Sequence, residues 1–451
     1  MNGEDLIRRA VARSAHVAEV RIGRGVLAET AQVYARHFTG PALLLADDRG
    51  WGAAGQQVEA ALTAAGIPCR RHVIPARPRP KPTVDLAEAL GAELGPGDTP
   101  IAIGSGVMND VVKYAAFMAG IPYMSVATAA SMDGYTSAGA PLSEKGFKKT
   151  IPCRPARVLL ADLDVIAAAP PEMTGWGYGD LAGKVPAGGD WIIADALGIE
   201  AIDDVAWPMV QDGLEGWLSR PELIAAGERS AVEGLFIGLT LVGLAMEAHG
   251  SSRPASGADH QIAHLWEMDD LHHRGERVSH GACVAVGALA VLRMYDWLLA
   301  QDLSTLDPAG RAEAALTLAA KEAEIRDRFG AGEIAERAIV ETRAKHVEGA
   351  ALHARLIRLR EVWPDLRARL RSRLWSADRM ARHLSRAGAP VEAADIGVDP
   401  GNLYRTILKA RFLRSRYTIL DLLDECGLLD QAAAAALPGS NRGSDQAGGG
   451  T

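Results

Sequence analysis

The sequence predicts an α/β nucleotide-binding domain built on a mostly parallel sheet, followed by an all-α domain. Short apolar runs alternate with amphipathic stretches through the first 170 residues. Such alternation is typical of parallel strands joined by helical crossovers. After Pro170-Pro171 helical periodicity dominates and strand signals are few. A chain of 451 residues is also too long for one ordinary core. We therefore expect domains at 1–170 and 171–436, and a disordered Gly/Ser-rich tail at 437–451.

The elements follow from apolar runs and their periodicity. The expected strands of the first domain are 42–46, 69–74, 100–103 and 123–126, and its expected helices are 56–65, 84–94 and 109–118. The expected helices of the second domain are 232–249, 282–296, 311–329 and 351–374. The longest apolar stretch, 234–246, is shorter than the ~20 residues that span a membrane. We expect it to be a buried helix and the protein to have no membrane span.

Composition excludes several classes of protein. The formal net charge of −8 argues against a nucleic-acid-binding surface. The four cysteines are scattered without a CxxC pair, which favours free thiols in a reducing compartment. The N-terminus lacks a basic segment followed by an apolar run, so we expect no signal peptide and a cytoplasmic protein.

A nucleotide site is suggested where expected strands end. Gly104-Ser-Gly106 follows an apolar strand and opens a helix, where a phosphate could approach free backbone N–H groups. The motif is short, and glycines at such turns are common without a ligand. The next strand runs into the hydroxyl-rich loop 128–137, at the edge where ligands of open α/β sheets gather. Asp47, after the first strand, is placed either to bind a ribose hydroxyl or to cap a helix.

Histidines are concentrated in one short stretch of the second half. Five lie between residues 260 and 280, against twelve in the whole chain. His260 and His264 share a helix face, and His280 precedes a glycine where a turn could return it to that face. Two histidines and a carboxylate would leave a metal an open position, as catalysis needs. A structural role for a single histidine remains the alternative, and His272-His273 lie in a charged run typical of surface.

Asp180 is the best candidate for the carboxylate. Asp180 and Lys184 stand four residues apart, which usually indicates a surface ion pair on a helix. Asp180 nevertheless follows the expected domain boundary, where a cleft would lie.

Together these residues resemble the sn-glycerol-1-phosphate dehydrogenase family, in its bacterial branch, within the superfamily of iron-containing alcohol dehydrogenases and dehydroquinate synthase. The resemblance runs in order from about residue 20 to 430. The matching segments are Gly104-Ser-Gly106 with Asp110 and Lys113, Thr128–Asp133, Gly179–Lys184 with Asp190-Trp191, Ser256–His264, His280-Gly281, Ala389–Gly397 and Arg416–Leu423.

The resemblance implies roles for individual residues. The implied metal ligands are Asp180, His260 and His280, and the implied substrate-contacting residues are Asp133, His264 and Asp180. The implied cofactor contacts are Asp47, Gly104, Gly106, Val107, Met108, Asn109, Asp110, Thr128, Ala129, Ala130, Ser131 and Ser137. NAD or NADP and one divalent metal (zinc, nickel or iron) are implied. The implied reaction reduces dihydroxyacetone phosphate to sn-glycerol 1-phosphate in a homodimer or higher homo-oligomer.

Four departures bear on substrate and cofactor preference. Ser105 stands where a glycine is usual, Met132 where a polar residue is more typical, Asp259 where glutamate is common, and Ala127-Thr128 replaces Pro-Thr. Lys184, Arg274 and Arg277 are candidate phosphate contacts by charge and sequence proximity, with surface solvation the alternative for the arginines. A sugar phosphate cyclase related to dehydroquinate synthase, a related polyol dehydrogenase and a non-catalytic nucleotide sensor are the competing functions.

Overall fold

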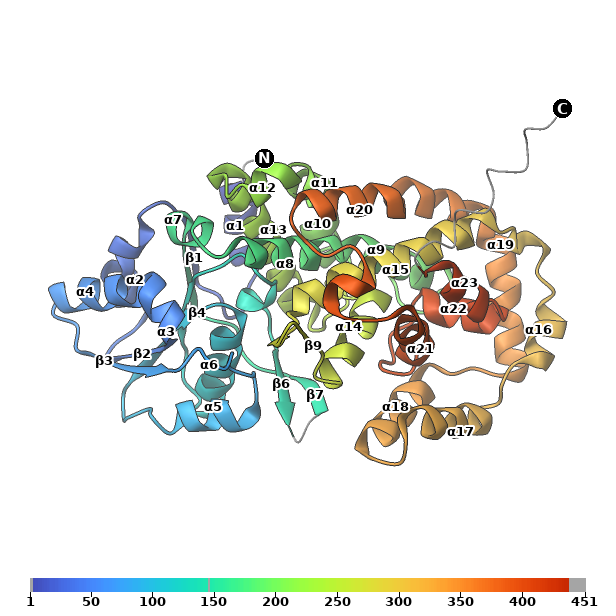
Figure 1. Cartoon of the computed structure of the whole chain (residues 1–451), viewed down its shortest axis with the longest axis horizontal. Coiled ribbons are helices and arrows are strands. Elements are labelled where there is room, and N and C mark those ends of the chain that lie inside the picture. Colours follow the sequence, from blue (N-terminus) through green and yellow to red (C-terminus); the bar gives the residue numbers. More distant parts are fainter. Residues whose placement is uncertain (1–2, 145–146, 438–451) are drawn as a thin grey trace.

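The computed structural model describes residues 3–144 and 147–437, and six parallel strands form its main sheet (Figure 1). The strand order is β1-β8-β5-β4-β2-β3, and every neighbouring pair is parallel. The strands are β1 (Glu19–Gly23), β2 (Ala42–Asp47), β3 (Cys69–Ile74), β4 (Thr99–Gly104), β5 (Met124–Ala127) and β8 (Val158–Asp162). The predicted parallel sheet is therefore confirmed.

Burial explains which strands lie inside the sheet. Strands β4, β5 and β8 are buried along their whole length, as central strands of a sheet covered on both faces are. Edge strands β1 and β3 are only partly buried. The sequence analysis did not predict β1 or β8, although β8 (Val-Leu-Leu-Ala-Asp) has the same apolar pattern as β2.

Helices cover both faces of this sheet. They are α2 (Thr30–His37), α3 (Asp48–Gly50), α4 (Gln56–Ala64), α5 (Val84–Gly91), α6 (Gly106–Met118) and α7 (Leu163–Ala167). Leu44 of β2 packs in one core with side chains of α2 and α4, whereas Leu43 and Leu45 pack with side chains of α5 and α6. This alternation is what a strand with two covered faces requires.

After α7 the described chain is helical, apart from a short hairpin of β9 (His272–His273) and β10 (Glu276–Arg277). The helices are α8 (Pro171–Ala182), α9 (Lys184–Ala196), α10 (Ala206–Gln211), α11 (Leu214–Leu218), α12 (Pro221–Ala225), α13 (Arg229–His249), α14 (Ala258–Met268), α15 (His280–Ala300), α16 (Pro308–Ala314), α17 (Leu318–Phe329), α18 (Glu333–Lys345), α19 (Gly349–Arg373), α20 (Ala377–Arg386), α21 (Pro400–Ala410), α22 (Ile419–Cys426) and α23 (Leu429–Ala435).

Two details correct the expectations for this half. The stretch 311–329 is not one helix, because Thr317 caps the start of α17 and separates it from α16. The region is also not purely helical, since β9 and β10 pair. The predicted tail at 437–451 falls, beyond Leu437, outside the described residues.

The two longest apolar helices are central to the helical core. Among the described residues, α13 and α15 are long and apolar enough to cross a membrane by length and composition. Most of each apolar window is buried inside the protein, so their hydrophobicity is used for packing. The N-terminal helix α1 (Gly3–Val11) packs on α13 through Ile7 and Ala10. Helix α1 therefore contacts the helical half, although it precedes the sheet in sequence.

A second hairpin reaches from the sheet toward the helices. Strands β6 (Ala140–Glu144) and β7 (Phe147–Ile151) pair antiparallel between β5 and β8 in the chain. In Figure 1 this hairpin lies between the sheet and the helical half. It contacts α14, so it brings side chains from the N-terminal half to the helix that carries the clustered histidines.

Candidate active site

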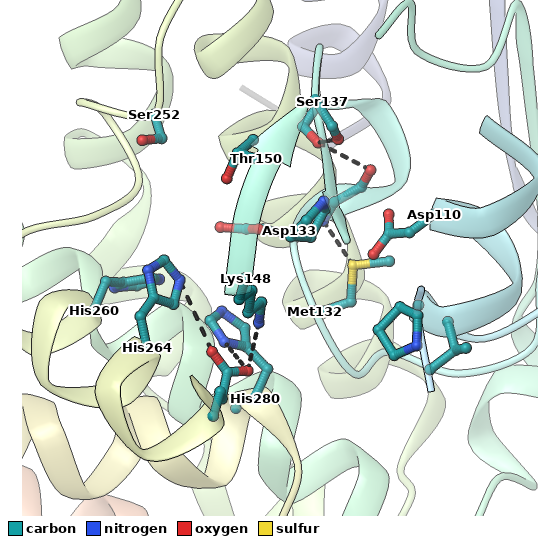
Figure 2. Close-up of a pocket in the computed structure, with 18 of the residues that line it drawn as sticks. Asp110, Met132, Asp133, Ser137, Lys148, Thr150, Ser252, His260, His264 and His280 are labelled. Atoms are coloured by element: carbon teal, nitrogen blue, oxygen red, sulfur yellow. Dashed lines mark hydrogen bonds and ion pairs between the residues drawn. The ribbon is translucent and has the colours of Figure 1, made fainter. Parts of the chain in front are cut away.

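A cavity of about 430 Å³ lies where the ends of the strands meet the helical half (Figure 2). One wall comes from the loops after β4 and β5, including Gly106 and Asp133. The opposite wall comes from α14 and α15, including His260, His264 and His280. The β6–β7 hairpin contributes Lys148 and Thr150 between them. Segments far apart in sequence thus share one pocket.

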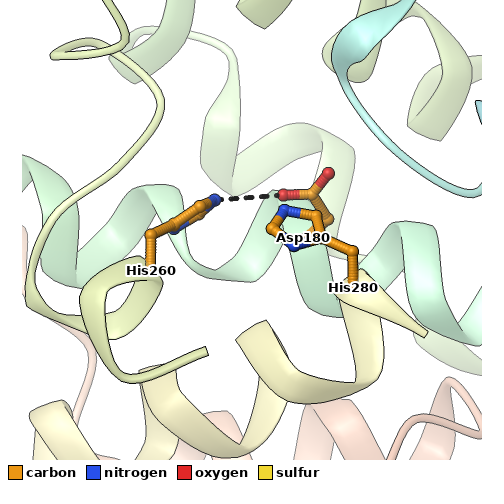
Figure 3. Close-up of side chains that lie close together, drawn as sticks. All are labelled: Asp180, His260 and His280. Carbon is orange, nitrogen blue, oxygen red and sulfur yellow. Dashed lines mark ion pairs between the residues drawn. The ribbon is translucent and has the colours of Figure 1, made fainter. Parts of the chain in front are cut away.

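Three predicted metal ligands converge at the helical wall (Figure 3). Asp180 is on α8, His260 on α14, and His280 is the first residue of α15. One potential ligand atom from each lies within 4.8 Å of the others, and His260 Nε2 is 3.5 Å from Asp180 Oδ1. Asp180 and His260 are buried. The structure therefore brings this set together.

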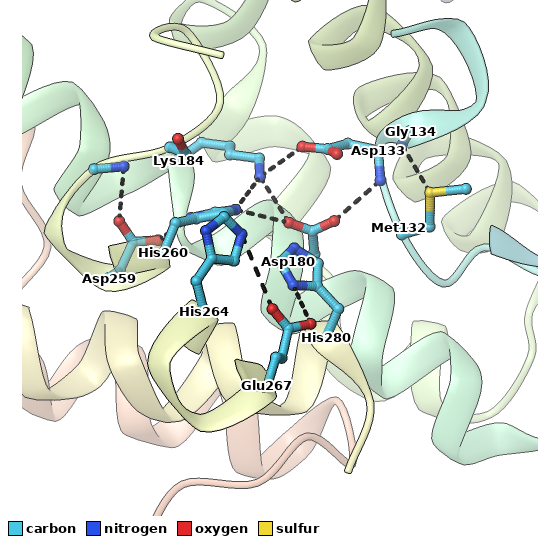
Figure 4. Close-up of polar contacts among 12 residues, drawn as sticks. Met132, Asp133, Gly134, Asp180, Lys184, Asp259, His260, His264, Glu267 and His280 are labelled. Carbon is cyan, nitrogen blue, oxygen red and sulfur yellow. Dashed lines mark hydrogen bonds and ion pairs between the residues drawn. The ribbon is translucent and has the colours of Figure 1, made fainter. Parts of the chain in front are cut away.

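Carboxylates orient both histidines, as Figure 4 shows. His260 Nδ1 lies 2.6 Å from Asp259 Oδ2, and His280 Nδ1 lies 3.0 Å from Glu267 Oε1. Each carboxylate fixes the proton on Nδ1 and leaves Nε2 with its lone pair, the form that binds a metal. His260 Nε2 then lies 3.5 Å from Asp180 Oδ1 and 3.5 Å from the Lys184 ammonium, which faces the same carboxylate oxygen. The donor set fits a divalent metal of the zinc, nickel or iron type.

Lys184 is buried beneath this set rather than paired at the surface. Its Nζ lies 2.7 Å from both Asp180 Oδ1 and Asp133 Oδ2, and all of its side chain is inaccessible. Burial alone would lower the pKa of Lys184, but the two carboxylates raise it above its usual range. Burial would raise the pKa of Asp180, yet Lys184 and His260 hold it well below its ordinary value. The surface pair expected from spacing was wrong. Lys184 is not in the pocket wall, so its proposed phosphate contact has no support.

Asp133 and His264, the two expected substrate contacts, both line the pocket. The Asp133 backbone N–H donates to Asp180 Oδ2 at 3.0 Å, which ties the loop after β5 to α8. Burial lowers the pKa of His264 well below its usual value, and the charges of Lys148 and Arg414 act in the same direction. His264, Glu267 and His280 form a second group with metal-ligating spacing. Asp180 with His260 and His280 is the set that the resemblance implies; Asp180 pairs with Lys184 at 2.7 Å, as Glu267 pairs with Lys148.

The first turn of α6 faces the pocket on the sheet side. The predicted cofactor residues in the pocket wall are Gly106, Val107, Asp110, Ser131 and Ser137. Those that lie outside the wall are Asp47, Gly104, Met108, Asn109, Thr128, Ala129 and Ala130. Met108 is a core residue, and the Asn109 amide donates to Asp110 and to the Gly134 carbonyl. Asn109 therefore stabilises the loop after β5 through hydrogen bonds inside the fold.

Two glycines allow close approaches at this junction. A Cβ on Gly177 of α8 would lie 1.9 Å from the Ala130 carbonyl oxygen, so only glycine lets α8 approach the loop after β5. A Cβ on Gly106 would lie 3.0 Å from Met132 Cγ. Met132, one of the departures, thus covers the start of α6, and its sulfur accepts from the Gly134 N–H.

Asp47, Arg274 and Arg277 are the remaining predicted residues. Asp47 caps α3, since its Oδ1 accepts from the Gly50 N–H at 2.6 Å. The capping alternative is therefore present, and a ribose contact stays a prediction. Arg274 is exposed and outside the pocket wall. Arg277 lines the pocket, but its Nε already donates to Asp270 at 2.8 Å.

The sequence analysis missed three residues that complete the site. Asp259 was noted only as a departure, yet it orients His260. Glu267 lies one helical turn after His264, so its spacing carried a usable signal. Burial would raise the pKa of Glu267, but Lys148 and His280 hold it well below the usual value. Lys148 had no local signal, because the β6–β7 hairpin was not predicted.

Comparisons with known proteins show the family to which this chain is similar. Residues 21–170 match the family model for iron-containing alcohol dehydrogenase. The glycerol-1-phosphate dehydrogenase (NAD(P)+) of Bacillus licheniformis is 31% identical over 350 residues, which is 77% of this chain and 74% of that protein. The Bacillus subtilis protein of the same name is 36% identical over 262 residues, covering 57% and 66%.

Solved structures support the fold. The glycerol dehydrogenase of Schizosaccharomyces pombe superposes with a TM-score of 0.58 over 93% of this chain and 90% of that one, at 16% sequence identity. At that identity the likeness concerns the fold alone. The Bacillus licheniformis relative matches over most of both chains at 31% identity, and this match shows the family as well as the fold. The chain belongs to the glycerol-1-phosphate dehydrogenase family, in its bacterial branch.

Proposed function

We propose that the protein reduces dihydroxyacetone phosphate to sn-glycerol 1-phosphate with NADH or NADPH and one divalent metal. The observation that carries this proposal is the shared pocket of two sites. His260 and His280 line one wall, with the buried Asp180 close to both, and the first turn of α6 opens on the other. Relatives at 31% and 36% identity are named glycerol-1-phosphate dehydrogenase (NAD(P)+).

The ligand set has a defined chemical task. Asp180, His260 and His280 would hold the metal, which supplies a Lewis acid for a ketone oxygen. Asp259 and Glu267 keep the two imidazoles in the tautomer that binds it. Lys184 holds the carboxylates of Asp133 and Asp180 in fixed positions, so that neither must reorganise when substrate binds.

The remaining residues orient substrate and cofactor. The bound nicotinamide supplies the hydride that reduces the ketone carbon. The Asp133 carboxylate accepts a hydrogen bond from the substrate hydroxyl, and His264 relays a proton to the new alcohol oxygen. The N–H groups at the start of α6 bind the cofactor pyrophosphate, helped by the helix dipole. The hydroxyls of Ser131 and Ser137 bind the cofactor from the loop after β5.

The wider setting is part of the proposal. We place the cofactor-binding domain at 1–170 and the metal- and substrate-binding domain at 171–436. The small phosphorylated substrate is the proposed partner, in a soluble cytoplasmic homodimer or higher homo-oligomer.

One assay tests the proposed reaction. NADH and NADPH oxidation is followed with dihydroxyacetone phosphate, dihydroxyacetone and glycerol, using metal-stripped and reconstituted enzyme. We expect turnover with dihydroxyacetone phosphate that is lost on chelation and restored by divalent ions. Net NADH consumption also excludes a cyclase, which regenerates its cofactor. Full activity in protein shown by elemental analysis to be metal-free would overturn the metal's role.

A further inference from the structure

The cavity is rich in cations, and most of them already have partners. The basic side chains in its wall are Arg79, Lys81, Lys148, Arg277 and Arg414. Lys148 pairs with Glu267 at 2.7 Å, and Lys81 and Arg277 both reach Asp270 Oδ1, at 3.2 and 2.8 Å. Each of these three cations thus has an ion-pair partner before any ligand arrives, although Lys81 and Arg277 share one carboxylate.

Arg79 and Arg414 have no ion-pair partner among the described residues. The Arg79 guanidinium stacks over the Trp176 ring at 4.9 Å, and its charged neighbours include Arg49 and Asp47. Arg79 therefore has a ring contact and charged neighbours from both halves of the chain. Arg414 lines the same cavity as His264, and its charge adds to burial in lowering the pKa of His264.

Arg414 is the cation of this pocket whose side chain has neither an ion-pair partner nor a ring contact within residues 3–144 and 147–437. It follows α21, in the segment that leads to α22. The nearby acid Glu341 is already engaged by Arg337, and it accepts from the Ser415 N–H at 2.8 Å. A guanidinium held in a cavity wall without a carboxylate is available for an anionic ligand.

Arg416, two residues after Arg414, donates hydrogen bonds to two serine hydroxyls in the wall of the same cavity. Arg416 Nη2 donates to Ser252 Oγ at 2.9 Å, and Nη1 donates to both the hydroxyl and the carbonyl oxygen of Ser256. Both serines line the cavity. A serine hydroxyl that accepts from arginine keeps its own O–H free to donate. Arg416 thus leaves two donors available to the ligand.

We propose that Arg414, with the hydroxyls of Ser252 and Ser256, binds the phosphate monoester of the substrate. The assignment rests on the proposed function and replaces the phosphate contacts expected at Lys184, Arg274 and Arg277. A phosphate presents three terminal oxygens, which match one guanidinium fork and two hydroxyls. The segment that supplies Arg414 follows the metal-binding histidines by more than 100 residues, so the C-terminal region selects the phosphorylated substrate.

Paired substrates separate this role from a general loss of activity. kcat/KM is measured with dihydroxyacetone phosphate and with dihydroxyacetone for wild type, Arg414→Gln, Arg414→Lys and Ser252→Ala. We expect Arg414→Gln to lose about 10- to 100-fold with the phosphorylated ketone, since bonds to charged groups are the strong ones. Its loss with dihydroxyacetone should be much smaller, because that substrate has no phosphate to bind. Arg414→Lys should lose less than Arg414→Gln, and Ser252→Ala, at an exposed position, about fivefold.

Arg274→Gln is the matched control, because it removes an exposed charge outside the cavity and should behave as wild type. Equal losses on both substrates in Arg414→Gln and Ser252→Ala would overturn the phosphate assignment. Titration with inorganic phosphate tests the phosphate assignment independently of the proposed reaction. If wild type does not turn over dihydroxyacetone phosphate, the reaction fails as proposed. The subsite then stands if wild type binds phosphate at least tenfold more tightly than Arg414→Gln, and falls if both bind alike.

Discussion

The two walls of the active-site cavity are built in different ways. Around the histidines of the helical wall, charged side chains from several elements are paired with one another before any ligand binds: Lys184 with Asp133 and Asp180, Asp259 with His260, and Glu267 with His280 and Lys148. On the sheet wall, the start of α6 offers backbone N–H groups and small residues. There the polar side chains of Asn109 and Lys113 bond within the protein.

The difference reflects what each wall must bind. A divalent cation needs ligand atoms fixed in position and protonation state, so the helical wall uses buried carboxylates around its histidines. A pyrophosphate is bound by aligned amides and needs open space, so the sheet wall depends on the absence of side chains. A substitution that weakens metal binding at one wall should therefore leave cofactor binding at the other wall unchanged, and the reverse should also hold.

The largest expected effect is the difference between alanine variants of His260 and His264, which lie one helical turn apart. His260→Ala should lose both bound metal and turnover, because it removes a ligand. His264→Ala should keep the metal and lose about 10²- to 10⁴-fold in kcat, the usual cost of an acid–base group. Metal per chain and kcat are measured together. If His264→Ala strips the metal while His260→Ala retains it, the two roles are exchanged.

Asp259→Asn tests whether the paired carboxylates matter to the metal. The neutral amide of this variant would lack the charge that fixes the proton on His260 Nδ1. We expect metal affinity to fall about 10- to 100-fold, measured by competition with a chelator. NADH affinity should be unchanged. A fall in cofactor affinity as large as that for the metal would show that the two walls are not independent.

Gly106→Ala tests the sheet wall. The new Cβ would lie 3.0 Å from Met132 Cγ, in the space over the start of α6. We expect NADH to bind about tenfold more weakly, roughly the cost of overpacking, with metal content unchanged. The double variant with Met132→Ala shows the cause. If the double variant binds NADH as tightly as wild type, the loss in Gly106→Ala comes from the contact with Met132 and not from lost space for the pyrophosphate.

The smallest expected effect concerns stability and pH in the metal-free protein. The pKa of Glu267 lies well below its usual value in the fold, despite burial, because of Lys148 and His280. A depressed carboxyl pKa stabilises the fold above the unfolded pKa, about 4.3 for glutamate. That stabilisation is lost as the pH falls through the folded pKa.

Glu267→Gln should therefore lower the unfolding free energy by about 1 kcal/mol at pH 7, and by progressively less below pH about 4. Urea unfolding at several pH values measures it. Glu215→Gln, which breaks an exposed pair with Arg379, is the control and should show little change. A difference that persists undiminished at low pH would exclude the ion-pair explanation.

The sequence by itself determined the fold class and the elements whose pattern is local. Apolar runs located β2, β3, β4 and β5 to within a residue or two, because buried parallel strands are continuous and short. The spacing of His260 and His264 placed both on one helix face, and Gly104-Ser-Gly106 marked the start of α6. These signals depend only on neighbouring residues.

Tertiary structure alone decided which partners complete the site. The spacing of Asp180 and Lys184 indicates an ion pair but not whether water reaches it, and packing of α8 against α15 helps to bury it. Lys148 and Arg414 line the same cavity as the histidines but come from segments more than 100 residues away in sequence. Local sequence pattern does not encode such contacts, because they arise only when the sheet, the hairpin and the C-terminal segment pack around one cavity.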